Sequence, residues 1–461
     1  MTAPVYTDEA HRRRIHEDLD ATLLVEAGAG TGKTRELIER LVRLVASGRA
    51  ELRSTAAITF TEAAAAELRD RIRLRLEEAA RDGSDLSEDE RRRCYDALTQ
   101  LDAAAIETLH AFAQRILSDH ALDAGLPPII DVQEEIRASI AFDERWAIFV
   151  DELLSDPSME ETLLRAFTLG LELNHLADVA RELHEHWDRL EAASIPDAPP
   201  PPIDATLVLA RLRQACELRG HCVEPDDKLV VHLEQVVEVY RQRLAAAETD
   251  LARLRLLAEP RKLSTGAGNK NNWEGITPAD IRRLLSDAQR RRDEMVRAAR
   301  VSVLASLLAA LRDFALAYAD ERRRSGRLEF HDLLVQARNL LRRDPAVRRD
   351  VRERYTHLLI DEFQDTDPLQ IEIATLIAAE EAAGAPPPWE EARVEPGRLF
   401  FVGDPKQSIY RFRRADIELY QRAQGRFSAG LVRLTENFRA DRKSTRLNSS
   451  HSRASRMPSS A

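Results

Sequence analysis

The 461-residue sequence predicts an α/β fold in which a parallel β-sheet domain is interrupted by a large all-helical insertion. Near both ends of the chain, short apolar runs alternate with segments of helical spacing, which is typical of parallel strands joined by helices. Between residues 131 and 324, almost every segment has helical spacing instead. Aromatic residues make up 5% of the chain and charged residues 32%, a balance that favours long helices with solvated faces over a β-sandwich.

The first α/β part begins with three predicted strands, each followed by a helix. The strands are predicted at Thr22–Glu26, Ala57–Thr61 and Ile106–Leu109. The helices are predicted over Arg35–Ala46, over Ala63–Ala80 and up to Leu117. Because a helix connects each strand to the next, the strands are expected to be parallel.

The alternating pattern stops at the insertion and returns after it. Loops within the insertion are expected at the Pro-rich Pro196–Pro202 and at the polar Ser264–Trp273. Strands are predicted again at His357–Asp361 and Leu399–Val402. The sequence therefore predicts a sheet domain at 1–125 and 325–430, with the helical insertion at 126–324.

The turn after the first strand carries a phosphate-binding pattern (P-loop), in which Ala27 stands where the pattern has its first Gly. Small residues let backbone N–H groups curl around phosphates, and the following helix adds its N-terminal dipole. Lys33 supplies a compact positive charge, and the Thr34 hydroxyl is a Mg²⁺ ligand. The alternative is a Gly-rich turn without nucleotide. The predicted nucleotide-binding residues are Ala27, Gly28, Ala29, Gly30, Thr31, Gly32, Lys33 and Thr34.

A phosphate-binding loop of this kind needs an acidic partner on a neighbouring strand. The apolar run Leu358–Ile360 ends in Asp361 and Glu362. Asp361 is predicted to hold Mg²⁺, and Glu362 is predicted to orient and polarise the attacking water. The alternative, an ordinary strand end, is weakened because Lys33 and Thr34 supply the other half of such a site. The predicted cofactors are therefore ATP and Mg²⁺.

Two longer runs resemble the motifs of one protein family. Asp361–Gln370 (DEFQDTDPLQ) resembles motif II of superfamily 1 helicases of the UvrD/Rep type. Gly403–Arg413 (GDPKQSIYRFR) resembles their motif III, and its sequence is most similar to that of the RecB/AddA branch. The resemblance implies a RecA-like P-loop motor domain, although the helical insertion carries no recognisable signature. Further matches, in family order, are Ile58–Ala63, Glu107–Phe112, Leu328–Leu334 and Leu434–Arg439.

The resemblance implies catalytic roles for Lys33, Asp361, Glu362, Gln407 and Arg439. Gln407 would sense the γ-phosphate, and Arg439 would reach it from a second motor domain as an arginine finger does. Phe438 would lie near the adenine. The family's adenine-reading Gln has no counterpart, because Glu9 or His11 stands in its place.

The resemblance also implies a path for single-stranded DNA. Phe60, Tyr410 and Phe412 match aromatic positions on which bases stack. Thr61 and His110 match positions that touch the DNA backbone. The alternative for Phe60 and Phe412 is an ordinary core position, and the alternative for Tyr410 is packing beneath the motif III loop.

The activity that the resemblance implies is ATP-dependent 3′–5′ DNA unwinding and single-stranded DNA translocation, in double-strand break repair or recombination. The expected partners are single-stranded and duplex DNA, and a further candidate partner is the second polypeptide of a helicase–nuclease. One alternative is a non-catalytic, nucleotide-dependent DNA-binding partner subunit, which the intact Lys33, Asp361, Glu362 and Gln407 disfavour. A P-loop kinase or transporter ATPase is disfavoured by motif III.

Composition indicates a cytoplasmic location without a membrane partner. The three cysteines have no framework spacing, which fits a reducing compartment. The N-terminus has no apolar leader, and no apolar run of membrane-spanning length is apparent. The net charge of -11 does not exclude nucleic acid, because phosphates are bound by local patches.

The end of the chain departs from the family pattern. Leu431–Ala440 is predicted to start a second RecA-like domain, as a strand without a sheet to join, and no counterpart of motifs V and VI follows. Asp441–His451 and Ser455–Ala461 read, codon by codon, as translated blocks of a common DNA-sequencing adapter, so residues 441–461 are predicted to be an artefact. The alternative is a disordered Ser/Arg tail. A chain truncated in this way is expected not to unwind DNA.

Overall fold

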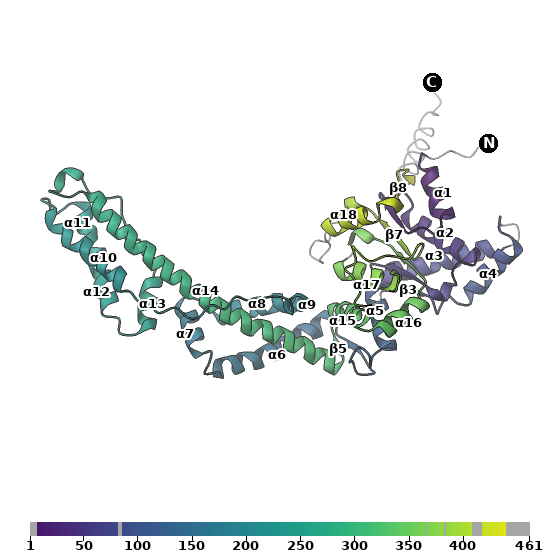
Figure 1. The fold of residues 1–461 in the computed structure, drawn as a ribbon, viewed down its shortest axis with the longest axis horizontal. Coiled ribbons are helices and arrows are strands. Elements are labelled where there is room, and N and C mark those ends of the chain that lie inside the picture. The colour runs from purple at the N-terminus through teal and green to yellow at the C-terminus, as the bar shows by residue number, and fades with distance from the viewer. Residues whose placement is uncertain (1–6, 82–84, 366, 382–383, 408–416, 439–461) are drawn as a thin grey trace, which may run out of the picture. The chain divides into compact units, whose positions relative to one another are not determined.

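The protein folds into two compact units in the computed structural model, which describes residues 7–81, 85–365, 367–381, 384–407 and 417–438. Unit 1 comprises the described residues up to 133 and from 323 onward, and unit 2 comprises Glu134–Arg322. Unit 1 is α/β and unit 2 is helical, so the predicted fold class is confirmed (Figure 1).

Unit 1 is built from strands and helices that alternate along the chain. Before the insertion its elements are α1 (Glu9–Glu17), β1 (Leu23–Ala27), α2 (Lys33–Ala46), η1 (Leu52–Ser54), β2 (Thr55–Thr59), α3 (Glu62–Ala80), α4 (Glu88–Leu98), β3 (Ala105–Thr108), α5 (Leu109–Asp119) and β4 (Asp131–Val132). After it come β5 (Arg327–Leu328), α15 (Phe330–Arg343), α16 (Pro345–Arg354), β6 (His357–Ile360), η5 (Phe363–Asp365), α17 (Pro368–Ala378), β7 (Leu399–Gly403), η6 (Pro405–Gln407), α18 (Ile417–Arg426), η8 (Ser428–Gly430) and β8 (Leu431–Leu434).

The main sheet of unit 1 has six parallel strands in the order β3-β2-β6-β7-β1-β8. Its central strands are nearly continuous apolar runs, because helices cover both faces of a parallel sheet. β7 lies between β1 and β6, with Val25 opposite Val402 and Phe401 opposite Ile360. The carboxyl ends of all six strands meet at one edge, which is where ligands bind in such sheets.

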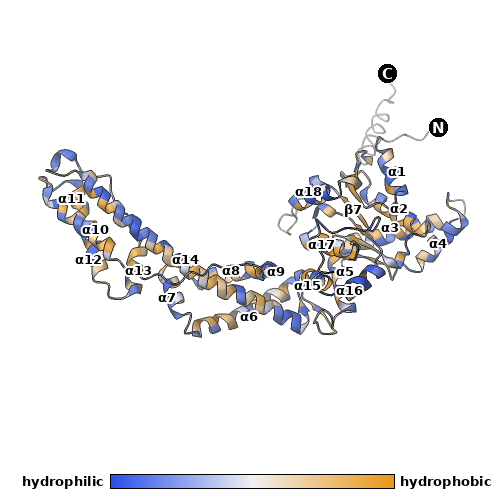
Figure 2. Cartoon of the chain, in the orientation of Figure 1, coloured by the Kyte–Doolittle hydropathy of each residue, from blue (hydrophilic) through white to orange (hydrophobic). Residues whose placement is uncertain are grey.

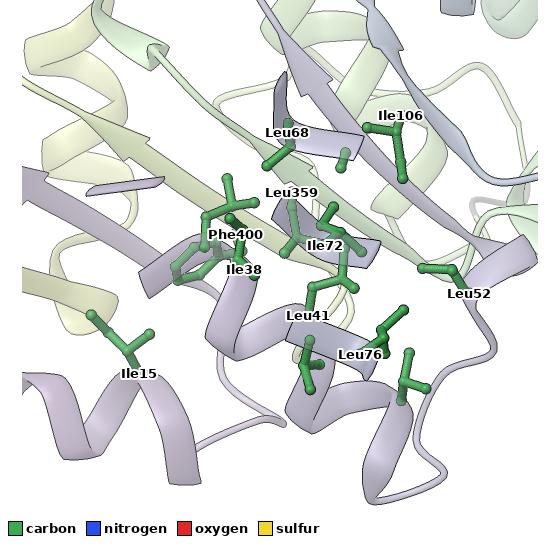
Figure 3. Close-up of a cluster of buried hydrophobic side chains, with 14 of the residues drawn as sticks. Ile15, Ile38, Leu41, Leu52, Leu68, Ile72, Leu76, Ile106, Leu359 and Phe400 are labelled. Atoms are coloured by element: carbon green, nitrogen blue, oxygen red, sulfur yellow. The ribbon is translucent and has the colours of Figure 1, made fainter. Parts of the chain in front are cut away.

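One face of the sheet is covered by α1, α2, α3 and α4. Figure 3 shows Leu41 of α2 and Ile72 of α3 lying together with Leu359 of β6 and Phe400 of β7. These four side chains are each at most 1% exposed. Burial of large aliphatic and aromatic side chains contributes about 1.5–3 kcal/mol each, so this core holds β6 and β7 firmly against α2.

The connection between α1 and β1 is fixed by a fully buried arginine on α2. Arg40 donates hydrogen bonds to four backbone carbonyls, those of Ile15, Asp18, Leu19 and Ala21. Its guanidinium lies 4.9 Å from the ring centre of Phe400. Burial lowers the pKa of Arg40 to about 10, which leaves it charged at neutral pH. The N-terminal helix is therefore tied to the helix that follows the phosphate-binding loop.

The last strand corrects one prediction. The sequence predicts that Leu431–Ala440 starts a second domain and has no sheet to join, and this is wrong for Leu431–Leu434. These four residues form β8, which pairs in parallel with β1 and completes the first sheet. Val432 and Leu434 are buried in the unit 1 core. Gly430 allows the approach, because a Cβ there would collide with the backbone that precedes β1.

The base of the insertion also differs from the expected boundary. β4 and β5 form a two-stranded parallel sheet, with Asp131 opposite Arg327 and Val132 opposite Leu328. Both strands belong to unit 1, so residues 126–133 lie with the sheet domain and not with the insertion. Two-residue strands carry too little periodicity to be seen in the sequence.

Unit 2 is a set of helices packed along one long helix. Its elements are α6 (Glu135–Ser155), α7 (Glu160–Thr168), α8 (Leu173–Glu185), α9 (Trp187–Leu190), α10 (Thr206–Glu217), η2 (Leu218–His221), α11 (Lys228–His232), the π-helical η3 (Leu233–Glu238), α12 (Val239–Ala245), α13 (Asp250–Ala258), η4 (Lys270–Asn272) and α14 (Pro278–Ser325). Figure 2 shows apolar and polar residues interspersed along these helices. Pro196–Pro202 and most of Ser264–Trp273 are loops, as predicted.

The long helix α14 contributes to two separate cores. Its first half, including Ile281 and Leu285, packs with α10 to α13, and its second half, including Leu311 and Phe314, packs with α6 to α8. One stretch of α14 is long and apolar enough to cross a membrane by composition alone. A core helix meets the same criterion, and the buried residues of α14 serve these two cores.

Candidate nucleotide-binding site

The phosphate-binding loop connects β1 to α2 at the carboxyl edge of the sheet. Gly30 and Gly32 have φ angles of 83° and 91°, a region in which any side chain would be strained. Thr31 closes the turn, since its N–H and its hydroxyl both donate to the carbonyl of Gly28, at 3.2 and 2.8 Å. α2 begins at Lys33, and the first N–H groups of a helix have no partner within it. The loop therefore presents amide donors and a positive helix end to an anion.

Four of the predicted site residues come together at this edge. Lys33 Nζ lies 3.0 Å from Glu362 Oε2, in an ion pair that joins α2 to the end of β6. The Thr34 hydroxyl lies 3.5 Å from Asp361 Oδ2. The parallel register of β1, β7 and β6 brings these residues together, although more than three hundred positions separate them along the chain.

The charges of this group are not balanced. Burial, together with the negative charge of Glu362, raises the pKa of Asp361 to about 6 against the attraction of Lys33. Two carboxyl groups therefore face one ammonium group, beside the Thr34 hydroxyl. Mg²⁺ prefers carboxylate and other oxygen ligands, so Asp361 and Thr34 form a donor set that fits this ion.

Glu362 is held in an unusual backbone conformation. Its φ of 53° is the only positive value at a non-glycine position among the described residues. Such a conformation costs about 1–3 kcal/mol and persists where the surroundings fix it, often at functional sites. The side chain of Glu362 is held as well, because Gln364 Nε2 donates to Glu362 Oε2 at 2.7 Å.

A hydrogen-bonded path leads from Glu362 to the region of Gln407. The Oε1 atom of Gln364 accepts from the backbone N–H of Asp404 at 2.7 Å. Asp404 Oδ2 in turn accepts from Gln407 Nε2 at 2.7 Å. The structure thus places Gln407 against Asp404, directly after β7. The sequence alone indicated no role for Gln364 or Asp404, although both lie in the runs that resemble motifs II and III.

A second charged group, which sequence reasoning missed, lies on the α1 side of the loop. We call Asp8, Arg12, His16 and Glu36 the N-terminal ion cluster. Arg12 donates to Asp8 Oδ1 at 2.9 Å and to Glu36 Oε1 at 2.5 Å. His16 Nε2 lies 2.6 Å from Glu36 Oε2. Arg12 also donates to the carbonyl of Thr31, at 3.1 Å, and so contacts the phosphate-binding loop.

The carboxyl groups of the N-terminal ion cluster accept several hydrogen bonds, and these favour their charged forms. Burial opposes the charged form of Asp8, but hydrogen bonds from Arg12 and from two backbone N–H groups outweigh it and lower its pKa. Burial likewise opposes the charged form of Glu36, and His16 and Arg12 together hold its pKa below its usual range. The only sequence signal is the i, i+4 spacing of Asp8 and Arg12, which is common in a chain with 68 Lys and Arg residues.

The segment after β8 lies against the phosphate-binding loop. The backbone N–H of Phe438 donates to the carbonyl of Gly30 at 2.9 Å, and Asn437 Nδ2 donates to the carbonyl of Ala29 at 2.9 Å. The Phe438 ring lies 3.8 Å from where a Gly32 Cβ would stand. The structure thus places Phe438 at the phosphate-binding loop, and its expected role beside the adenine stays a prediction.

The predicted DNA contacts that the structure describes lie at the same sheet edge. Phe60 follows β2 directly and is half-buried, and Thr61 is the exposed N-cap of α3, whose hydroxyl accepts from the N–H of Ala64 at 3.1 Å. His110 lies at the start of α5, with its ring 5.7 Å from that of Phe330 in an edge-to-face contact. β2 ends at Thr59, two residues before the predicted end, so Phe60 belongs to the loop.

Some of the predicted site residues are not among those that the structure shows at the carboxyl edge of the sheet. Tyr410, Phe412, Arg439 and the tail 441–461 lie outside the described residues. Of the two residues that stand near the position of an adenine-reading Gln, Glu9 is exposed at the start of α1. His11 instead contacts β8, where its Nδ1 atom lies 2.5 Å from the carbonyl oxygen of Arg433.

Comparison with known proteins gives a consistent result. Residues 8–428 match the family described as UvrD/REP helicase N-terminal domain. The chain is similar to the A-subunits of the ATP-dependent helicase/nucleases of Ligilactobacillus salivarius (25% identity over 93% of the chain), Levilactobacillus brevis (29% over 91%) and Exiguobacterium sibiricum (27% over 94%). It spans 37%, 36% and 38% of the length of these relatives. The chain therefore belongs to the UvrD/REP helicase family, in its RecB/AddA branch.

Proposed function

We propose that this chain forms the first ATPase half of an ATP-driven DNA motor, a 3′–5′ single-stranded DNA translocase and helicase that acts in double-strand break repair or recombination. One observation carries the proposal: the folded sheet brings Lys33, Thr34, Asp361 and Glu362 together beside the phosphate-binding loop. The proposed repair role is supported by membership of the UvrD/REP helicase family and by the similarity to helicase/nuclease subunits, and the 3′–5′ polarity is what the family resemblance implies.

The residues divide the chemistry between them. The loop amides and Lys33 bind and neutralise the phosphates, while Thr34 and Asp361 would hold Mg²⁺. When bound, Mg²⁺ neutralises charge on the terminal phosphates. Glu362, positioned by its backbone and by Gln364, orients a water molecule and accepts its proton.

The rest of the motor cycle involves a second motor domain in addition to Gln407 of unit 1. In this proposal Arg439 supplies an arginine finger from that domain, and Gln407 connects phosphate contacts to DNA. The 461-residue chain covers just over a third of the length of its relatives, so we expect it to bind nucleotide but not to unwind DNA by itself. The second polypeptide of a helicase–nuclease is the proposed partner, and the cytoplasm is the proposed location.

The path of DNA is proposed to follow the sheet edge. Phe60, Thr61 and His110 lie at the ends of neighbouring strands β2 and β3, whose residues Thr59 and Thr108 are opposite each other. A half-buried aromatic residue beside an exposed hydroxyl suits the stacking of bases next to backbone contacts. Tyr410 and Phe412 are proposed to extend this path.

The proposal is tested by nucleotide binding to the 461-residue chain. We expect Lys33→Ala to weaken binding of a fluorescent ATP analogue by at least about 100-fold, because a charge contact to the phosphates is lost while the loop glycines remain. Lys262→Ala, at an exposed lysine of unit 2, is the matched control and should bind like the wild type. Equal affinity of the Lys33→Ala variant and the wild type would contradict the assignment.

The second candidate function is a non-catalytic, nucleotide-dependent DNA-binding subunit. It shares the binding result above but needs no residue to activate water. The strained backbone of Glu362 and its hydrogen bond from Gln364 favour catalysis, because mere binding does not require that carboxylate to be held in place.

A further inference from the structure

The N-terminal ion cluster holds one end of the segment that lies on the phosphate-binding loop. Asp8 is 4% exposed, and its single oxygen Oδ2 accepts three hydrogen bonds. Two come from the backbone N–H groups of Thr435 and Glu436, at 2.9 and 3.0 Å, and the third comes from Arg12, at 3.1 Å. The exit from β8 is therefore fixed by a buried carboxylate at the start of the N-terminal helix.

The same cluster also contacts the loop itself. Arg12 is 7% exposed and connects Asp8 to Glu36 on α2 and to the carbonyl of Thr31 in the loop. Glu36 is 3% exposed and accepts from Arg12 and His16. Because each charge is paired and hydrogen-bonded, the cluster is a rigid connection, whereas removal of one partner would leave a buried charge uncompensated.

The far end of the held segment is Phe438. Its N–H is bonded to Gly30, and its ring faces the guanidinium of Arg12 at 5.0 Å. The position of a Gly32 Cβ lies 3.8 Å from the Phe438 ring and 3.9 Å from Arg12 Nη1. The ring thus lies beside both Arg12 of the cluster and the last glycine of the loop.

We infer that Asp8, Arg12 and Glu36 are positioning residues that hold residues 435–438 on the phosphate-binding loop and so place Phe438 for the base of a bound nucleotide. The inference rests on the proposed function. It divides the site into two parts. The loop itself binds the phosphates, whereas the base is bound by Phe438, which the cluster holds in position. In this proposal the cluster residues act through the loop and Phe438 and do not themselves touch the nucleotide.

This division predicts a selective effect of Asp8→Asn. If the carbonyl oxygen of an asparagine accepts from the two backbone N–H groups, its amide N–H₂ group faces Arg12 Nε–H as a second donor, so the paired contact with Arg12 and the two backbone hydrogen bonds cannot all be kept. The contacts of Arg12 with Glu36 and Thr31 remain. The phosphate part should therefore stay intact while Phe438 loses its fixed position.

The experiment compares two probes on the 461-residue chain, ATP and inorganic tripolyphosphate, by calorimetry. We expect Asp8→Asn to bind ATP about tenfold more weakly and tripolyphosphate within about twofold of the wild type, because stacking is lost and phosphate contacts are kept. Arg12→Lys keeps the charge but loses both the paired geometry with Asp8 and the present contact with Thr31, so it should weaken the binding of ATP as well. The matched control is Asp20→Asn, which breaks an exposed ion pair with Arg49 and should change neither affinity.

The outcomes separate the inference from the proposed function. A parallel loss of both affinities in Asp8→Asn would overturn the inference, because the cluster would then support the loop as a whole. Unchanged affinity for both probes in Asp8→Asn would overturn it too. A wild-type chain that binds neither probe, or a Lys33→Ala variant that binds both normally, would instead remove the proposed function and the inference with it.

Discussion

Two groups of carboxylates flank the same phosphate-binding loop, and they are opposite in character. On the β6 side, Asp361 and Glu362 share one lysine, the pKa of Asp361 is raised to about 6, and the backbone of Glu362 is strained. On the α1 side, Asp8 and Glu36 are saturated with hydrogen bonds, and their pKa values are lowered. Burial penalises both groups, and only the second is compensated within the protein.

The difference separates the proposed reactive site from the residues that are proposed to support it. An uncompensated buried carboxylate indicates a place where a cation or a reacting proton belongs, since strongly perturbed groups gather at functional sites. A compensated carboxylate fixes geometry and has no capacity left for a ligand. Proximity to the loop alone does not distinguish them, because both groups lie within reach of its residues.

The largest effect that tests this comparison is on catalysis. In a longer form of the protein that carries a second motor domain, Glu362→Gln should retain ATP binding and reduce DNA-stimulated hydrolysis by about 10²–10⁴-fold, because an amide cannot accept a proton from water. Glu381→Gln, at an exposed ion pair with Arg349, is the control and should hydrolyse ATP normally. If Glu362→Gln lost nucleotide binding together with turnover, Glu362 would be a structural residue and the comparison would fail.

A smaller effect concerns stability without metal. At pH 8 in the presence of a chelator, Asp361→Asn should raise the unfolding free energy by about 1–2 kcal/mol, because the raised pKa means that the folded state disfavours its charge. Asp8→Asn should lower the unfolding free energy by about 1–3 kcal/mol, because the pKa of Asp8 is lowered and Arg12 would lose one of its two carboxylate partners. Thermal unfolding of the two variants shows whether each substitution raises or lowers the unfolding free energy. Shifts in the same direction would show that the two groups do not differ in this way.

The smallest effect extends the comparison to the other end of β6. Burial, with the charges of Arg398 and Arg40, lowers the pKa of His357 to about 4. A lowered histidine pKa means that stability is complete above about pH 6.5 and is lost as the pH falls toward 4. At pH 5, the protein with His357→Gln should therefore lose about 1–2 kcal/mol less unfolding free energy than the wild type does. Melting temperatures at pH 7.5 and pH 5 measure it, with the exposed His221→Gln as control, and an equal acid shift in both variants would contradict the assignment.

The parts of the site that the sequence predicted are those with local signals. Gly30, Gly32 and Lys33 stand in a strand–turn–helix context, and Asp361 and Glu362 end an apolar run, so short windows suffice to find them. The fold class followed from the same alternation of runs and helices. Which strands are neighbours in the sheet is decided by packing between segments far apart in the chain.

The missed features share this non-local origin. β8 is only four residues long, so its sequence does not indicate which strand it pairs with. Its pairing with β1 depends on the close approach at Gly430 and on the burial of Val432 and Leu434. The N-terminal ion cluster joins residues 8, 12 and 36 to residues 435 and 436, and no spacing rule connects these positions. Burial selects these pairs from the many charges of the chain, and burial is a property of the complete fold.

The position of β1 in the sheet has a consequence for the order in which the protein matures. β1 is made early, but both of its neighbours, β7 and β8, come from residues 399–434. At about 5–20 residues per second, a ribosome would take about 20–80 s to supply them after β1 emerges. During that time the core of β2 and β3 and the helices of unit 2 can form, while β1 has no partner strand. The proposed nucleotide site would then close only after residues 399–434 have been made, so that a nascent chain shorter than this has no complete site in which to capture ATP.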